Sequence, residues 1–185
     1  MGNIIECKEP GYGAPVVKAA PNDTLFFPHV ESCLAMLFLL DNGYMVGAHV
    51  AQTEGDQIVQ NVLATARANA YKYLIKMEQV ANGLGSFPIL YVTCGNDPTR
   101  ADGSATLYGR AQLEGKVAAD AAAAGRFVPY THIERSAAAG IDVYVYGNSH
   151  IVKVEDHASH AQIDAVSLNE WLKASGRLDG EAAHT

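Results

Sequence analysis

The sequence contains few cysteines, and their spacing excludes two kinds of small-domain framework. Three cysteines occur among the 185 residues, at Cys7, Cys33 and Cys94. An odd number with such wide spacing argues against a disulfide network and against a cysteine zinc cluster, and it favours a reducing compartment. We therefore expect the chain in the cytoplasm, or exported without a cleaved signal peptide, since such a protein would have the same composition.

Long apolar runs and basic clusters are also missing. No apolar stretch approaches the ~20 residues of a membrane span, and the N-terminus has no basic segment followed by an apolar one. The formal net charge is −7 and no run of Lys or Arg stands out, whereas nucleic acids and anionic membranes attract positive charge. Neither is therefore expected as a partner.

What the sequence does contain is enough apolar material for a core. Apolar residues make up 49% of the chain and charged residues 18%, which is typical of a folded domain, and the length fits one domain. We expect an irregular lead-in over residues 1–23, with at most a short strand at Val16-Val17. We expect a single α/β domain over residues 24–176, followed by a flexible tail over residues 177–185.

The apolar pattern predicts strands and helices in mixed order. Helical spacing extends over residues 56–81, and a second helix opens at Ser104 or Thr106 and ends at Gly125. A short third helix follows the capping box that starts at Ser167. The expected strands are 25–27, 33–40, 44–51, 87–94, 127–133, 141–146 and 150–155. This order indicates an α/β fold with a mixed sheet, or a two-sheet sandwich, and helices packed outside.

The hairpin 33–51 carries the best pair of candidate catalytic residues, Cys33 and His49. If Asp41-Asn42-Gly43 form its loop, Ala35 faces His49. Cys33 is then a diagonal neighbour of His49 on the same face, with the two Cα atoms ~7–8 Å apart and the side chains able to meet. A loop of Asn42-Gly43 alone would put the two side chains on opposite faces. The three-residue sequence suits a type I turn with Gly at the bulge, which favours the first register. A thiol hydrolase needs a cysteine and a base in such proximity, although a lone buried cysteine is most often a core residue.

The same residues carry a family resemblance. The stretches Val30–Ala35, Asp41-Asn42-Gly43 and Val46–Val50 resemble the active-site hairpin of CheD, the chemoreceptor glutamine deamidase. The CheD fold is shared by toxins related to cytotoxic necrotizing factor and Burkholderia lethal factor. The resemblance covers about twenty residues of motif together with the order of elements. It implies a Cys33–His49 pair that hydrolyses the carboxamide of a protein glutamine.

The chain departs from this family at two positions. Phe27 occupies the place of the Thr that orients the histidine in CheD and the lethal factor, and Glu31 replaces a Gly. Thr24 is nearby in sequence and is our candidate for the orienting side chain. The alternative is a main-chain carbonyl from residues 25–29, in the manner that the resemblance to the necrotizing factors implies.

We therefore predict a cysteine-dependent amidohydrolase, a divergent CheD-like deamidase or a bacterial effector toxin. Its catalytic residues would be Cys33, His49 and Thr24, with no cofactor and no metal, and its partner a protein with an exposed glutamine. The main-chain N–H of Cys33 would help to bind the oxyanion. Two alternatives remain, a non-catalytic protein-binding domain on the same scaffold and a papain-like thiol hydrolase. In papain-like enzymes, however, Cys and His lie much further apart in sequence.

Two other groups of residues are weaker candidates. His157 and His160, with His150 and Asp156 nearby, have a spacing that can bind a metal, but their polar context makes solvated histidines the simpler interpretation. Cys94 ends a buried strand, and we expect it to serve in packing.

Overall fold

The computed structural model describes residues 2–9, 16–31, 33–50, 62–96 and 128–174, with only the main chain for 62–71. These residues form ten strands and two helices. In chain order they are β1 (Ile4–Glu6), β2 (Val17–Ala19), β3 (Thr24–Val30), β4 (Leu34–Leu40), β5 (Met45–Val50), α1 (Val62–Gly83), β6 (Pro88–Asn96), β7 (Tyr130–Arg135), β8 (Ile141–Tyr146), β9 (Ile151–Asp156), β10 (Gln162–Ser167) and α3 (Asn169–Ala174).

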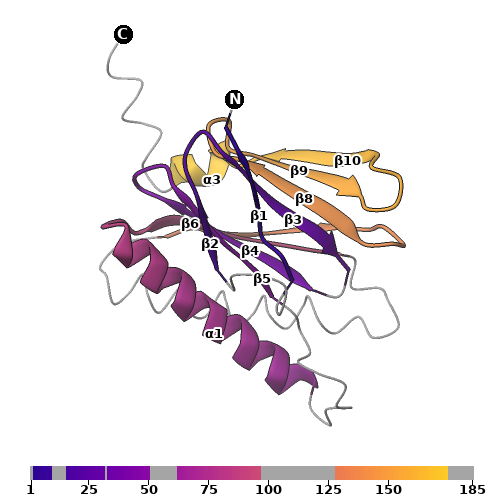
Figure 1. Cartoon of the computed structure of the whole chain (residues 1–185), viewed down its shortest axis with the longest axis horizontal. Coiled ribbons are helices and arrows are strands. Elements are labelled where there is room, and N and C mark those ends of the chain that lie inside the picture. Colours follow the sequence, from indigo (N-terminus) through magenta and orange to yellow (C-terminus); the bar gives the residue numbers. More distant parts are fainter. Residues whose placement is uncertain (1, 10–15, 32, 51–61, 97–127, 175–185) are drawn as a thin grey trace.

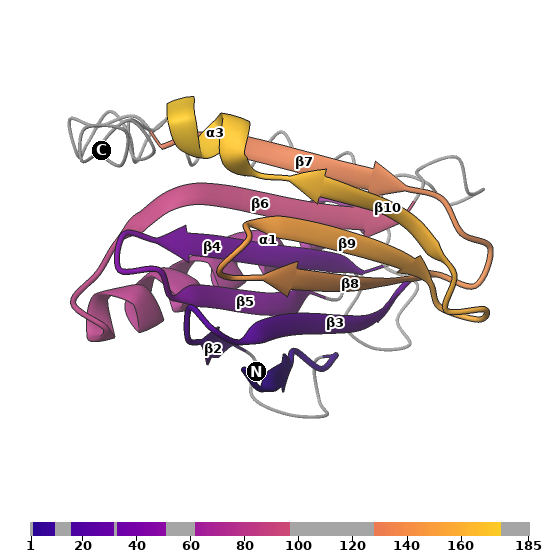
Figure 2. The same ribbon diagram turned by 90° about the horizontal axis from the view of Figure 1, so that it is seen from above.

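The strands are arranged in two mixed five-stranded sheets that face one another (Figures 1 and 2). The first sheet has the order β1-β3-β8-β9-β10 and the second the order β2-β5-β4-β6-β7. The β1–β3 and β6–β7 pairs are parallel and the other pairs are antiparallel. The fold is therefore α/β with a two-sheet arrangement and flanking helices, as the sequence predicted.

The β4–β5 hairpin has the register that the three-residue loop predicted. Ala35 pairs with His49 and Leu39 with Met45. The Gly43 N–H donates to the Leu40 carbonyl, and Gly43 has a φ of 81°, a conformation that glycine adopts without steric cost. This register fixes which side chains of the hairpin lie between the two sheets.

Both faces of β4 are buried, and its residues alternate between two cores. Its odd-numbered side chains lie between the sheets, together with Leu25, Phe27 and Val143. Its even-numbered side chains pack against the helical face, where Leu74 and Met77 of α1 are fully buried. The continuous apolar sequence of β4 follows from this position, because a central strand that is covered on both faces needs no polar side chains.

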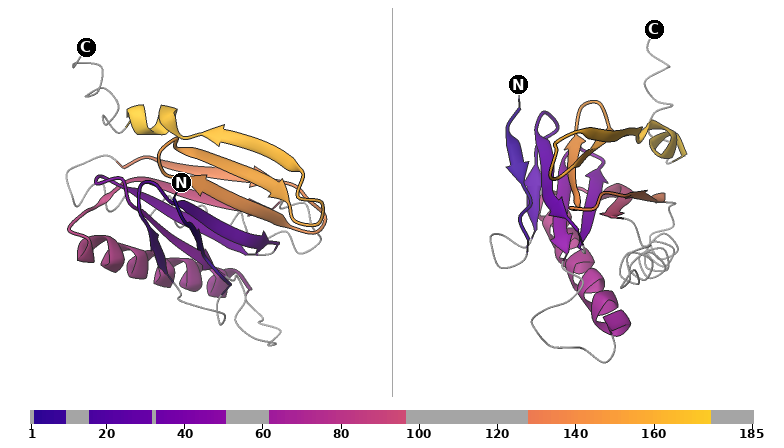
Figure 3. Two further views of the ribbon diagram at one scale, coloured as in Figure 1. Left: turned by 45° about the horizontal axis from the view of Figure 1, so that its top comes forward. Right: turned by 90° about the vertical axis from the view of Figure 1, so that its right-hand side faces the viewer.

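Helix α1 lies along the face of the second sheet that is turned away from the first (Figures 1 and 3). It ends at Gly83, two residues beyond the end of the predicted helical spacing at residue 81, and Gly85 follows with a φ of 66°. The predicted start near residue 56 and the second predicted helix lie outside the described residues. In the part of the chain that the structure describes, no helix is long and apolar enough to cross a membrane.

The N-terminal segment is more ordered than the sequence indicated. The short strand expected at Val16-Val17 is present as β2, which pairs with β5. The irregular lead-in expected before it is corrected at Ile4–Glu6, where β1 pairs with β3. Both β1 and β2 are edge strands, so this segment contributes to both sheets. Strand β10 was also not predicted. Its residues are exposed or half-buried, which leaves almost no apolar alternation to detect.

The two sheets approach closely at Gly47. A Cβ atom at this position would lie 2.6 Å from Leu25 Cδ2 and 2.9 Å from Phe27 Cζ. Only glycine fits between β5 and β3 at this distance. Gly47, two residues before His49, therefore allows the first sheet to pack closely against the second sheet at this point.

Candidate functional site

Cys33 and His49 come together on the inner face of the second sheet. Cys33 immediately precedes β4, and His49 is the penultimate residue of β5, directly opposite Ala35. The Cys33 Sγ and a ring nitrogen of His49 lie within 4.8 Å of one another. The sequence prediction that the two side chains lie on one face of the hairpin is confirmed.

The His49 imidazole is oriented by a main-chain oxygen. Its Nδ1 lies 3.3 Å from the carbonyl oxygen of Cys7, which directly follows β1. A carbonyl oxygen only accepts hydrogen bonds, so in the neutral ring the proton resides on Nδ1 and Nε2 keeps its lone pair. His49 is 1% exposed, and its Nε2 has no hydrogen-bond partner within the described part of the chain. The unprotonated nitrogen is thus the one available to accept a proton.

Thr24 does not orient His49, and neither does a carbonyl from residues 25–29. The hydrogen bond of His49 goes to Cys7, and Thr24 lies at the opposite end of β3, paired with Ile4 and Tyr146. Because β1 runs parallel to β3 from Ile4 towards Cys7, Thr24 is about three residues, or ~10 Å, from the level of the histidine. The orienting group is a main-chain carbonyl, which is one of the two kinds of group that the sequence analysis considered. It belongs to Cys7, however, and not to residues 25–29.

Burial keeps both members of the pair neutral. Desolvation, with smaller contributions from the nearby Glu9 and Glu31 carboxylates, raises the pKa of the Cys33 thiol to about 12. Desolvation also lowers the pKa of His49, against smaller opposite effects from Glu9 and the Cys7 carbonyl. The site therefore holds a thiol beside a neutral imidazole, and not a thiolate–imidazolium ion pair.

Glu9 is the third side chain of the site, and sequence reasoning missed it. Its carboxylate lies within 4.8 Å of both the Cys33 Sγ and the His49 ring nitrogen. Glu9 also lines an open hollow of about 320 Å³. The described residues that line this hollow are Glu6, Lys8, Glu9, Pro28 and His29. No sequence pattern identified Glu9, because it lies in a segment without recognisable periodicity.

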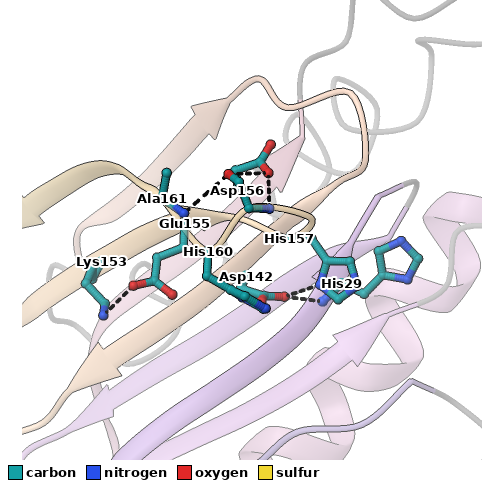
Figure 4. A network of polar contacts seen from close by, with 9 residues as sticks. His29, Asp142, Lys153, Glu155, Asp156, His157, His160 and Ala161 are labelled. Carbon is teal, nitrogen blue, oxygen red and sulfur yellow. Dashed lines mark hydrogen bonds and ion pairs between the residues drawn. The ribbon is translucent and has the colours of Figure 1, made fainter.

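One wall of the hollow is fixed by a polar network around Asp142, shown in Figure 4. Asp142 is 2% exposed. Its carboxylate accepts hydrogen bonds of 2.8 Å from the main-chain N–H of His29 and from His157 Nδ1. The His29 ring stacks on His157 with the centroids 4.3 Å apart, and His29 has a φ of 50°. Asp142 thereby holds the irregular end of β3, four residues before Cys33.

The histidines that were candidate metal ligands do not form a common site. His157 and His160 both face Asp142, but His160 Nδ1 is 3.8 Å from it and its side chain is 70% exposed. His150 lies at the other end of β9 beside Asn169, and Asp156 is engaged by Ser159. Among the described residues, the one group of three metal-ligating side chains is Glu9, Cys33 and His49.

The other two cysteines are packing residues. Cys94 is 1% exposed and borders a closed apolar gap of about 10 Å³ between the sheets, which is at the lower limit for one water molecule. Cys7 is fully buried, and its N–H donates to the Phe26 carbonyl. All three cysteines are free thiols. Cys33 differs from the other two in that its sulfur lies within 4.8 Å of both a His49 ring nitrogen and the Glu9 carboxylate.

Comparison with known proteins adds no family. No family model matches the chain, and no curated protein matches it.

Proposed function

We propose that the protein is a cysteine-dependent amidohydrolase that deamidates glutamine side chains of a partner protein. The observation that supports this most is a buried His49 whose unprotonated Nε2 has no hydrogen-bond partner among the described residues, and whose ring lies within 4.8 Å of the Cys33 sulfur. A nucleophile, a base and a group that orients the base are the three elements of nucleophilic amide hydrolysis. The resemblance of the β4–β5 hairpin to CheD supplies the substrate class.

The reaction divides between the two side chains. Cys33 Sγ forms a bond to the carboxamide carbon as its proton passes to His49 Nε2, and the Cys33 N–H at the start of β4 stabilises the oxyanion. The imidazolium then protonates the amide nitrogen, the C–N bond breaks and ammonia leaves. His49 next accepts a proton from a water molecule as the oxygen of that water attacks the carbonyl carbon of the thioester. The S–C bond breaks, the sulfur regains the proton, and glutamate is released.

The neutral resting pair determines when the thiol loses its proton. Because desolvation disfavours the thiolate, deprotonation accompanies attack on the substrate and does not precede it. The Cys7 carbonyl stabilises the imidazolium that forms, since its oxygen accepts the Nδ1–H more strongly when the ring is charged. Cys7 therefore has the role that the Asp has in a serine triad, as a weaker, uncharged acceptor.

The substrate reaches the pair from the hollow beside Glu9. Cys33 is 8% exposed, so a long, narrow side chain such as glutamine fits this approach better than a bulky group. The three free thiols fit a reducing compartment, which we propose is the cytoplasm of the producing cell or of a target cell. The partner is a protein that presents its glutamine on an exposed loop.

The test compares Cys33→Ser with Cys94→Ser, two nearly isosteric changes at buried thiols. Cell lysate proteins are incubated with wild type and each variant, and glutamine-containing peptides are searched by mass spectrometry for a gain of about 1 Da. We expect the gain with wild type and Cys94→Ser but not with Cys33→Ser, because His49 alone activates a hydroxyl poorly. Cys33→Ser should still bind the partner, since a protein surface is recognised well beyond one carboxamide.

The near-complete burial of Cys33 favours one alternative, a protein-binding domain in which Cys33 and His49 are core residues. This alternative predicts the same peptide masses with wild type and Cys33→Ser, together with an unchanged affinity for a captured partner. That result would contradict the amidohydrolase.

A further inference from the structure

The donor atoms of Glu9, Cys33 and His49 form a mixed oxygen, sulfur and nitrogen set. All three atoms lie within 4.8 Å of one another, and Cys33 and His49 are buried. In a tetrahedral zinc site with bonds of ~2.0–2.3 Å, neighbouring ligand atoms are roughly 3.3–3.7 Å apart. Shortening these separations by at most about 1.5 Å, within the reach of side-chain rotation, would complete such a geometry.

The orientation of His49 independently indicates a ligand. Its Nε2 is buried, carries the lone pair and has no hydrogen-bond partner among the residues described. A buried polar atom without a partner is costly unless something binds it. The Nδ1–H donates to the Cys7 carbonyl, which is the arrangement that fixes the tautomer and direction of a metal-ligating histidine.

We propose that Glu9, Cys33 and His49 bind a soft divalent cation of the zinc class. A Cys, His and carboxylate set matches the ligands that Zn²⁺ takes, and three protein ligands leave one position open. Cys33 loses its proton to solvent on coordination, so the thiolate and the Glu9 carboxylate together balance the charge of the cation. Because Glu9 lines the open hollow, the cation has access and its fourth position faces solvent.

The consequence for activity rests on the proposed function. A bound cation occupies both the sulfur that would attack the carboxamide and the nitrogen that would accept the proton. Zinc and substrate are then mutually exclusive, and zinc inhibits the amidohydrolase reversibly. The cation site would thus hold the enzyme inactive until a competing ligand or chelator removes the metal.

Binding is measured without any substrate. Metal-free full-length protein is titrated with Zn²⁺ in competition with a chromophoric chelator, and separately with Co²⁺ while the absorption spectrum is recorded. We expect one Zn²⁺ per chain, and a thiolate-to-cobalt charge-transfer band in the wild-type spectrum, a result that depends on no variant. Cys33→Ser, His49→Gln and Glu9→Gln should each weaken Zn²⁺ binding at least roughly tenfold.

Two substitutions serve as matched controls. Glu6→Gln removes a second carboxylate from the hollow, and Cys94→Ser removes a second buried thiol, so both should keep the wild-type affinity. Far-ultraviolet circular dichroism checks that each variant is folded. Unchanged Zn²⁺ affinity in Cys33→Ser, or a cobalt spectrum without the thiolate band, would overturn the site.

The activity measurement separates the two proposals. Zn²⁺-dependent loss of deamidation that a chelator reverses supports the inhibitory role, and stimulation by Zn²⁺ overturns it. If the three variants lose Zn²⁺ binding but no glutamine is ever deamidated, the cation site stands and the amidohydrolase fails. If Cys33-dependent deamidation occurs and Zn²⁺ does not bind, the cation site fails alone.

Discussion

At the scale of single residues, the orientation of His49 beside Cys33 depends on a main-chain oxygen. The Cys7 carbonyl fixes the tautomer of His49 from a position 42 residues earlier in the chain. Every residue has a carbonyl group, so no side chain identity records this role. The position of the orienting group follows from the parallel β1–β3 pairing, which places the residue after β1 over the end of β5.

The first prediction concerns Thr24. Because Thr24 lies at the far end of β3 from His49, Thr24→Ala and Thr24→Ser should both keep turnover on a glutamine substrate close to the wild-type value. Nuclear magnetic resonance of ¹⁵N-labelled imidazoles should show the Nδ1–H tautomer of His49 in both variants. A large drop in turnover with Ala that Ser restores would show that the hydroxyl has the orienting role after all.

At the scale of elements, the β4–β5 hairpin shows how far local sequence determines the site. Its loop, its register and the shared face of Cys33 and His49 were all predictable, because loop length and turn chemistry fix the pairing of a hairpin. Strand β1 was not predictable, since three partly exposed residues at a sheet edge carry no apolar alternation. Glu9 and the Cys7 carbonyl come with β1, so they were missed together.

The second prediction tests the close approach of the two sheets. Gly47→Ala should lower the free energy of unfolding by ~1–3 kcal/mol, because its Cβ would overlap Leu25 and Phe27 and force the sheets apart. Gly83→Ala is the matched control. A Cβ there has nothing within 4 Å, and alanine favours the helical conformation. We expect it to be neutral or slightly stabilising in urea unfolding, and equal effects of the two changes would contradict the packing.

At the scale of the whole molecule, the site depends on three segments that meet between the sheets. The end of β1 supplies the carbonyl and Glu9, the start of β4 supplies the thiol, and the end of β5 supplies the base. The order of elements predicted the two-layer architecture, but local sequence patterns do not reveal which edges of the two sheets lie together. That arrangement results from the packing of two apolar faces, which is non-directional and leaves little local signal.

The burial of all three thiols in this arrangement gives a pH dependence that belongs to the fold as a whole. Desolvation raises the pKa values of Cys7, Cys33 and Cys94 from 9.0 to about 12. Between these two values the unfolded chain has lost protons that the folded chain retains. Stability is therefore fully present below about pH 9 and falls as the pH rises towards 12, by about 1.4 kcal/mol per pH unit for each thiol.

The third prediction isolates one of these thiols with Cys94→Ala. This variant should be less stable than wild type by about 1 kcal/mol at pH 8, because it enlarges an apolar gap between the sheets. Its stability should then fall less steeply between pH 9 and pH 11, since one of the raised pKa values is gone, and the two curves of stability against pH should converge and cross near about pH 10. Urea unfolding in the presence of a reductant measures both slopes, and the titration of Lys and Tyr residues cancels in the comparison. Parallel curves over this range would mean that Cys94 ionises in the folded protein at its ordinary pKa, and that water reaches the space between the sheets.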